Sequence, residues 1–163
     1  MQIKKMFSKN KIVIYISIAI FFIDRASKEY IVNLSDIDKV TNLKVTSFLN
    51  LNLIFNKGIA FGVLAVNDSF YYNIITIIII IISLAVLLMA LKTNGAEKYY
   101  FSMIFGGAIG NIFDRLFYSA VVDFIDVHIN NTHWFIFNFA DIFICFGVLL
   151  LIALEISRIT NKK

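Results

Sequence analysis

Residues Val121–Asp141 read VVDFIDVHINNTHWFIFNFAD, a stretch with one aspartate near its start, Asp123, and another at its end, Asp141. Asp141 opens a long apolar run, Ile142–Ile156, in which Glu155 is the only charged residue. Acidic side chains beside sequence this hydrophobic are costly to place in a membrane, so they mark functional sites. We therefore expect Asp123 and Asp141 to form a carboxylate pair at the outer end of a bundle of membrane helices.

The composition is typical of an integral membrane protein. Of the 163 residues, 60% are hydrophobic, and the mean hydropathy is +0.82. A soluble domain is about 45–50% apolar, so these residues exceed what one water-soluble core of this size can hold. The net charge is +4, and basic residues gather at the two ends of the chain (Lys4, Lys5, Lys9, Lys11, Arg158, Lys162 and Lys163). This distribution is an orientation signal, and no nucleic-acid partner is expected.

Four apolar segments predict four transmembrane helices in one domain covering residues 1–163, at about 12–32, 70–91, 99–117 and 139–156. At about 1.5 Å per residue, the first is about 31 Å long, enough to cross a bilayer core. A basic start followed by apolar sequence is also typical of a secretory signal peptide, but no small-residue cleavage site follows. An even number of spans places both termini on one side, which the positive-inside rule makes the cytoplasm.

Two segments between these helices are predicted to lie outside the membrane. In residues 41–62, most odd positions from Leu43 to Phe55 are apolar and most even positions are polar. This period of two predicts strands with one apolar face, and hence a small sheet on the outer membrane surface. The segment ends in NKGIAFG, Asn56–Gly62, whose glycines predict a turn. Residues 118–138 form the second external segment.

No metal or cofactor site is predicted. Cys145 is the only cysteine, and within an apolar run it is expected to be a small buried hydrophobic residue. His128 and His133 could in principle bind a metal, but they have no companion ligands at suitable spacing. The chemistry must therefore come from other residues.

The predicted topology brings ionisable groups from separate helices to one depth near the outer surface. Asp24 lies in the outer half of the first helix and, at i,i+4 spacing, can pair with Lys28. The outer end of the third helix adds three polar residues, Asn111, Asp114 and Arg115. Separate solvated helix ends with snorkelling charges are the alternative, and close helix packing alone can explain the spacing of Gly106 and Gly110.

A carboxylate pair at such a boundary has a defined chemistry. Burial and mutual repulsion let the pair hold one shared proton near neutral pH. The ionised carboxylate can take a proton from water, and the protonated one can polarise a carbonyl and then protonate the leaving amine. The residues thus favour an aspartic protease.

A transporter and a non-catalytic scaffold are the alternative functions. A proton relay also uses intramembrane Asp, Lys and Arg residues, but it predicts polar groups through the full membrane depth. The cytoplasmic halves of the four predicted helices are nearly free of charge. A scaffold assembled through Gly106 and Gly110 leaves the ordered polar motifs of the chain unexplained.

Five motifs, in order and over nearly the whole chain, resemble the lipoprotein signal peptidase family, the type II signal peptidases of bacteria. They are DRASK (Asp24–Lys28), NKGIAFG (Asn56–Gly62), GGAIGNIFDR (Gly106–Arg115), VVDFIDV (Val121–Val127) and FNFAD (Phe137–Asp141). The resemblance implies a four-helix intramembrane aspartyl endopeptidase with an external β-cradle and a short external helix. It implies cleavage of diacylglyceryl-modified prolipoproteins just before the lipid-modified cysteine. We expect a monomer surrounded by lipid of the bacterial inner (cytoplasmic) membrane, with the active site near its extracytoplasmic face.

Carried onto this sequence, the resemblance implies that Asp123 and Asp141 are the catalytic dyad and that Asp126 is structural. It also implies that four polar residues surround the substrate backbone and the dyad: Asn56, Asn111, Arg115 and Asn138. Two more residues, Asp24 and Lys28, match a supporting pair, and Asp114 matches a structural acid. Ile59 occupies a position that is often small in the family, which affects the shape of the cradle.

Overall fold

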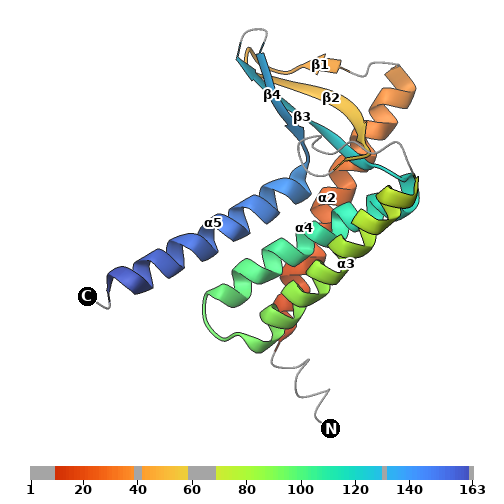
Figure 1. Cartoon of the computed structure of the whole chain (residues 1–163). Helices are drawn as coiled ribbons and strands as arrows, with labels where there is room; N and C mark the ends of the chain where they lie inside the picture. Colours follow the sequence, from red (N-terminus) through yellow and green to blue (C-terminus); the bar gives the residue numbers. More distant parts are fainter. Residues whose placement is uncertain (1–9, 39–41, 59–68, 130–131, 162–163) are drawn as a thin grey trace.

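Four helices and a four-stranded sheet make up the part of the chain that this computed structural model describes, residues 10–38, 42–58, 69–129 and 132–161 (Figure 1). The helices are α2 (Lys11–Asp38), α3 (Ser69–Lys92), α4 (Glu97–Tyr118) and α5 (Phe139–Thr160). The strands are β1 (Asn42–Lys44), β2 (Leu49–Asn56), β3 (Val121–Ile129) and β4 (Thr132–Phe137). The short external helix that the resemblance implies is not found within these described ranges.

The helices lie at the four predicted apolar segments, and two of them have the character of membrane spans. By length and composition, α3 and α5 are apolar enough to cross a membrane. Few of their residues are buried in the protein, and large side chains such as Ile77, Ile81, Leu149 and Ile152 are exposed. Exposed apolar helices of this kind need a lipid environment. Helix α2 continues to Asp38, six residues beyond the predicted end at 32.

Helix α4 packs against each of the other three helices, and its glycines permit the close contacts. A Cβ atom on Gly107 would lie 2.5 Å from the carbonyl oxygen of Ala140 in α5. A Cβ atom on Gly110 would lie 2.5 Å from an Asp24 carboxylate oxygen in α2. The absent side chains therefore let α4 approach the start of α5 and the charged part of α2.

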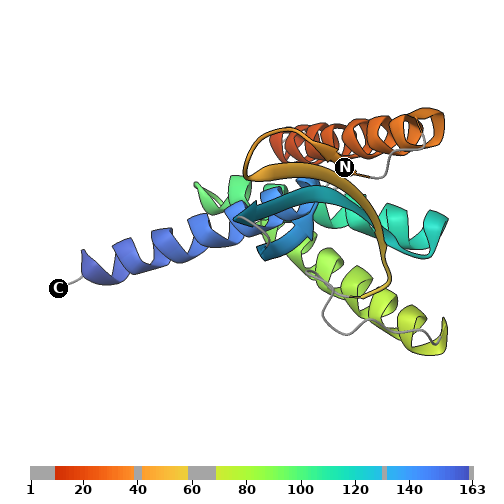
Figure 2. The same ribbon diagram turned by 90° about the horizontal axis from the view of Figure 1, so that it is seen from above.

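The sheet is antiparallel, in the order β1-β2-β3-β4, and lies across the end of the helix bundle at which α5 begins (Figures 1 and 2). Strands β1 and β2 lie in the segment where period-two alternation predicted strands. Strands β3 and β4 lie in residues 118–138, for which no strands were predicted. Of the predicted turn at Asn56–Gly62, residues 59–62 lie outside the described residues, and so does the Ile59 position.

The two aspartates of β3 lie on opposite faces of the sheet. Side chains alternate along a strand, so Asp123 shares its face with Ile125 and Val127, while Asp126 lies on the other. Asp126 is fully buried, and its register partner in β2 is Asn50. An irregularity between Leu51 and Ile54 shifts the register of β2 and sets Ile54 opposite Asp123.

Candidate active site

Asp123 and Asp141 line one cavity of about 370 Å³ at the junction of the sheet and the helices. Asp123 comes from β3, and Asp141 comes from the first turn of α5. Polar side chains of Asn56, Asn111 and Arg115 also line the cavity. The rest of its wall is mostly apolar: Ile79, Ala108, Val121, Ile144, Cys145, Val148 and Leu149. The wall of the cavity is therefore polar around the two aspartates and apolar elsewhere.

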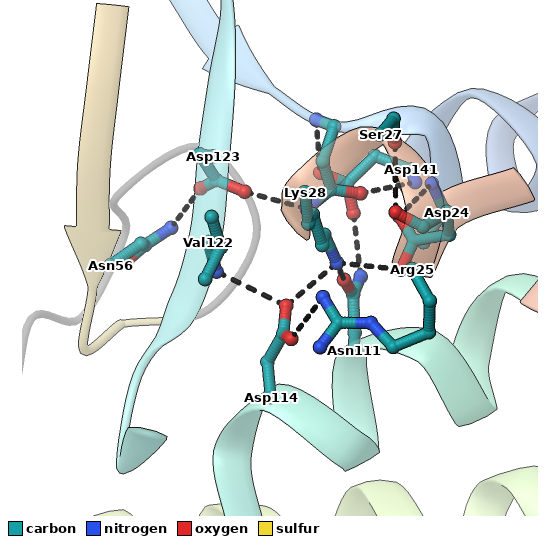
Figure 3. Close-up of polar contacts among 12 residues, drawn as sticks. Asp24, Arg25, Ser27, Lys28, Asn56, Asn111, Asp114, Val122, Asp123 and Asp141 are labelled. Carbon is teal, nitrogen blue, oxygen red and sulfur yellow. Dashed lines mark hydrogen bonds and ion pairs between the residues drawn. The ribbon is translucent and has the colours of Figure 1, made fainter. Parts of the chain in front are cut away.

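Three asparagine side chains connect the two carboxylates. Asn138 Nδ2 donates to Asp123 Oδ1 over 2.6 Å, and Asn56 Nδ2 donates to Asp123 Oδ2 over 2.9 Å. Asn111 Nδ2 donates to Asp141 Oδ1 over 2.8 Å, and Asn111 Oδ1 accepts from Asn138 Nδ2 over 3.2 Å (Figure 3). Both aspartates are therefore held in one network with fixed side-chain orientations.

The local sequence FNFAD explains why Asp141 lies at this position. Asn138 caps α5, since its Oδ1 accepts from the Asp141 amide over 3.0 Å. In return, Asp141 Oδ2 accepts from the Asn138 amide over 3.2 Å, which completes a capping box. The same Asn138 side chain bonds to Asp123, so one residue starts the helix and joins the two carboxylates.

Burial raises the pKa of the Asp123 carboxyl group. Its side chain is 3% exposed, and desolvation is the main cause that raises its pKa from 3.8 to about 7. Repulsion from Asp141 raises the pKa further, while hydrogen bonds from Asn56 and Asn138 partly offset the shift. The Asp123 carboxyl group can thus carry or release a proton near neutral pH.

Behind the two aspartates lies a buried cluster of charges that balances to zero. Lys28 Nζ lies 2.8 Å from Asp24 Oδ2, 2.7 Å from Asp114 Oδ2 and 2.9 Å from Asn111 Oδ1. Arg25 pairs with Asp114 Oδ1 at 2.7 Å (Figure 3). The side chains of Asp24, Lys28 and Asp114 are at most 1% exposed. Buried charges are tolerated in an apolar environment when they are paired and hydrogen-bonded, as they are here.

The two acids of this cluster also hold the backbone next to each cavity aspartate. Asp24 Oδ1 accepts from the amide of Ala140, one residue before Asp141, over 3.0 Å. Asp114 Oδ2 accepts from the amide of Val122, one residue before Asp123, over 3.1 Å. Because Lys28 bridges both acids, the start of α5 and strand β3 are fixed to a common support.

Arg115 reaches the cavity from α4. Its side chain is 5% exposed, its Nη2 donates to the carbonyl oxygen of Gly58 over 2.5 Å, and its guanidinium lies over the ring of Tyr72. Gly58 lies at the end of the described part of the NKGIAFG motif. The residue therefore connects α3, α4 and the chain after β2.

The structure brings together all nine side chains that the sequence singled out, from five elements. They are Asp24, Lys28, Asn56, Asn111, Asp114, Arg115, Asp123, Asn138 and Asp141. Asp126 lies on the opposite face of the sheet and is not among the residues lining the cavity. The predicted burial of Cys145 is wrong: the residue is exposed and lines the cavity, because α5 turns apolar side chains outward.

Three residues in or beside the network were not predicted: Arg25, Gly58 and Tyr72. Arg25 lies inside the DRASK motif, so charge complementarity with an acid on a neighbouring helix was the available signal. Gly58 contributes only a backbone carbonyl, and Tyr72 looks in sequence like any aromatic residue at a helix start. Within the described residues, no group of three or more His, Cys, Asp or Glu side chains could hold a metal ion.

Comparisons with known proteins point to one family. The family model described as signal peptidase (SPase) II matches residues 16–157. The lipoprotein signal peptidase of Pelagibacter ubique (strain HTCC1062) is 46% identical over 151 residues, 91% of each chain. That of Francisella tularensis subsp. mediasiatica (strain FSC147) is 42% identical over 127 residues, 75% of this chain and 77% of the relative.

Solved structures agree with the sequence comparisons. A bacterial membrane enzyme structure obtained by the in meso method at 2.3 Å resolution matches with a TM-score of 0.77 and 33% identity. The match covers 94% of this chain and 92% of the other. A second such structure, at 1.9 Å resolution, matches with a TM-score of 0.72 and 32% identity over 89% and 92% of the two chains.

Proposed function

Since the chain belongs to the signal peptidase II family, we propose that Asp123 and Asp141 are the catalytic pair with which it cleaves prolipoproteins. The family predicted from the five sequence motifs is confirmed, and the chain is a protease that removes signal peptides from prolipoproteins. The observation that carries the proposed pair is the asparagine network, which holds both carboxylates at one cavity.

The pair acts as a general acid and a general base on one water molecule. The ionised carboxylate removes a proton from the water, whose oxygen attacks the scissile carbonyl carbon. The protonated carboxylate donates a hydrogen bond to the carbonyl oxygen and then gives its proton to the leaving amine. Water is thereby added across the peptide bond, and the pair is left with one proton, as it began. A pKa of about 7 at Asp123 suits this exchange near neutral pH.

The surrounding residues have supporting roles in this proposal. Asn138 and Asn111 orient the two carboxylates, and Asn56 donates a hydrogen bond to Asp123 Oδ2. The buried cluster formed by Asp24, Lys28 and Asp114 fixes the backbone beside each catalytic aspartate. Such second layers of contact keep catalytic groups within the narrow range of geometry that the reaction needs.

The apolar wall of the cavity supports a diacylglyceryl-modified substrate. Ile144, Val148 and Leu149 follow Asp141 along one side of α5 and line the cavity beside it. Acyl chains and an apolar signal peptide bury their surface favourably against such residues. A lipid-modified cysteine placed there sets the preceding peptide bond beside the aspartate pair, which favours cleavage just before that cysteine.

The orientation that we propose is the one predicted from the sequence. Four spans, formed by α2 to α5, place both termini in the cytoplasm and the sheet on the extracytoplasmic side of the bacterial inner membrane. The exposed apolar faces of α3 and α5 support contact with lipid. The charges of α2 and α4 are paired inside the bundle, which makes these helices compatible with crossing the membrane. All of the described residues that line the cavity come from one chain, which supports the monomer as the proposed working form.

A cleavage assay with two matched peptides tests the proposed substrate. Purified protein in lipid is incubated with a synthetic prolipoprotein peptide carrying a diacylglyceryl group on its cysteine, and with the same peptide lacking the group. Mass spectrometry should find the modified peptide cut just before the cysteine and the unmodified one intact. Equal cleavage of both peptides, or a cut at another bond, would contradict the proposed role of the apolar wall.

A further inference from the structure

Tyr72 is turned into the protein at a position where its neighbours face outward. It lies in the first turn of α3 and is 7% exposed, whereas Phe70 and Tyr71 are 64% and 56% exposed. An aromatic side chain at the end of a membrane helix often lies at the headgroup level instead. The inward orientation of Tyr72 therefore calls for a partner inside the bundle.

That partner is Arg115. The guanidinium carbon of Arg115 lies 5.3 Å from the centre of the Tyr72 ring, within the range of a cation–π contact. The Tyr72 hydroxyl donates to the Arg115 carbonyl oxygen at 3.5 Å, the outer limit of a hydrogen bond. The Tyr72 hydroxyl also lies near the Arg115 side chain. The ring contact is the link that lies over the guanidinium.

Among the described residues, the contacts of Arg115 leave one of its nitrogens, Nη1, without a hydrogen-bond acceptor. Nη2 donates to the carbonyl of Gly58, which together with the Tyr72 ring fixes the plane of the guanidinium. Nη1 is buried and has no hydrogen-bond partner among the described residues. A buried N–H group without an acceptor is costly, so this nitrogen is suited to an acceptor that arrives from outside. Arg115 lines the cavity with Asp123 and Asp141, where a bound peptide presents carbonyl oxygens.

We infer that Tyr72 is a positioning residue, whose ring holds the Arg115 guanidinium so that Nη1 meets a backbone carbonyl of the bound substrate. This inference rests on the proposed function, because it needs a peptide in the cavity. Tyr72 itself touches no reacting atom. Of the Arg115 side-chain contacts with described residues given above, loss of the Tyr72 ring leaves the hydrogen bond to Gly58, which fixes one end of the guanidinium but not its tilt.

The effect of Tyr72 variants on substrate affinity tests this role. Tyr72→Leu is expected to raise KM about threefold to thirtyfold, the range of a cation–π contact, with kcat nearly unchanged. Tyr72→Phe keeps the ring and should retain a near wild-type KM. Tyr71→Leu removes an exposed tyrosine one position away and serves as the matched control. An equal rise in KM for Phe and Leu at position 72 overturns the inference.

Two further measurements separate positioning from simple packing. In an Arg115→Lys background, Tyr72→Leu should have little further effect, because the planar group that the ring orients is gone. The same loss in both backgrounds would mean that Tyr72 acts independently of Arg115, contrary to the inference. If Tyr72→Leu does not fold, the role of the ring can be tested instead with variants that carry a phenylalanine with one, two or three ring fluorines at position 72. They keep the shape of the ring but weaken its negative face, so KM should rise with each fluorine.

The same assay distinguishes this inference from the proposed function. Failure of the wild-type protein to cleave the modified peptide, or full cleavage by Asp123→Asn, would reject the proposed catalytic pair. Normal cleavage by the wild type, none by Asp123→Asn and an unchanged KM for Tyr72→Leu would reject only the role of Tyr72.

Discussion

At the scale of single residues, Asn138 has two separable tasks. It caps α5 through its side-chain oxygen and orients Asp123 through its side-chain nitrogen. Asn138→Ala removes both, and loss of the cap should cost about 0.5–2 kcal/mol of stability. Asn138→Ser retains a capping oxygen but has no amide donor, so it should regain most of the stability while cleavage stays about tenfold or more below wild type. Thermal unfolding and kcat/KM of the two variants check this, and equal activity of Asn138→Ser and wild type would contradict the orienting role.

Asp123 should make the stability of the protein depend on pH. Its pKa is about 7 in the folded protein against an ordinary value of 3.8, so between these values the folded state holds a proton that the unfolded state lacks. The contribution of Asp123 to stability is therefore greatest below about pH 4 and is lost as the pH rises through about 7, a change of about 2–4 kcal/mol.

The comparison with Asp123→Asn isolates this contribution. The variant cannot ionise at this position, so its unfolding free energy should fall less than that of the wild type between pH 4 and pH 8. Chemical denaturation in detergent at several pH values measures both slopes. Parallel slopes would show that the Asp123 carboxyl group is not held at a raised pKa.

Side-chain types and order in the chain predict most of the site, but not its backbone and aromatic contacts. Carboxylates, amides and cations beside apolar sequence are conspicuous because their burial is costly, and this marked Asp24, Asp114 and Asp141. Gly58 acts through a carbonyl that every residue possesses. Tyr72 differs from Tyr71 only in the direction that it faces, which depends on how α3 is rotated against α4.

At the scale of elements, strand β3 shows why half of the sheet was missed. Alternation of apolar and polar residues marks a strand with one solvated face, and β2 has this pattern. In β3, both faces are buried near the site: Val122 and Phe124 on one, Val121 and Asp123 on the other. Because β3 has no solvated face here and has an acid on each side, its sequence does not alternate between apolar and polar residues, and the strand could not be predicted from that pattern.

The buried contacts that hold β3 and the start of α5, which carry the proposed catalytic pair, depend on Lys28. Lys28→Met removes the cation between Asp24 and Asp114 and leaves two buried acids with one remaining partner, Arg25. Breaking a buried charge pair typically costs about 3–5 kcal/mol, so the variant should unfold at a lower temperature and lose cleavage activity. Glu29→Gln, at the adjacent exposed position, is the control and should change neither. A stable and active Lys28→Met protein would show that the cluster does not hold β3 and α5 in place.

At the scale of the whole molecule, the polar site lies at the sheet end of the helices, and the start of α2 and the end of α5 lie away from it (Figure 1). In the four-span topology that we propose, the turn between β1 and β2 faces the extracytoplasmic side, and the end of α5 faces the cytoplasm. In a Cys145→Ser background, Ser47→Cys and Asn161→Cys place single exposed thiols at these two points. A membrane-impermeant maleimide added to intact spheroplasts should label Ser47→Cys at once and Asn161→Cys only after the membrane is opened. Labelling of both in intact spheroplasts would contradict the four-span topology.

The central claim is that Asp123 and Asp141 work as one acid–base unit, and a double-mutant comparison of cleavage rates tests it most directly. Asp123→Asn and Asp141→Asn each keep the size of the side chain and remove its ionisable proton. Each should lower kcat by about 10³-fold or more, and the double variant should be hardly slower than either single one, because residues that act as a unit are not additive. Asp126→Asn, on the opposite face of β3, controls for changes to the strand and should remain active. Losses that multiply in the double variant, or full activity in either single variant, would contradict the claim.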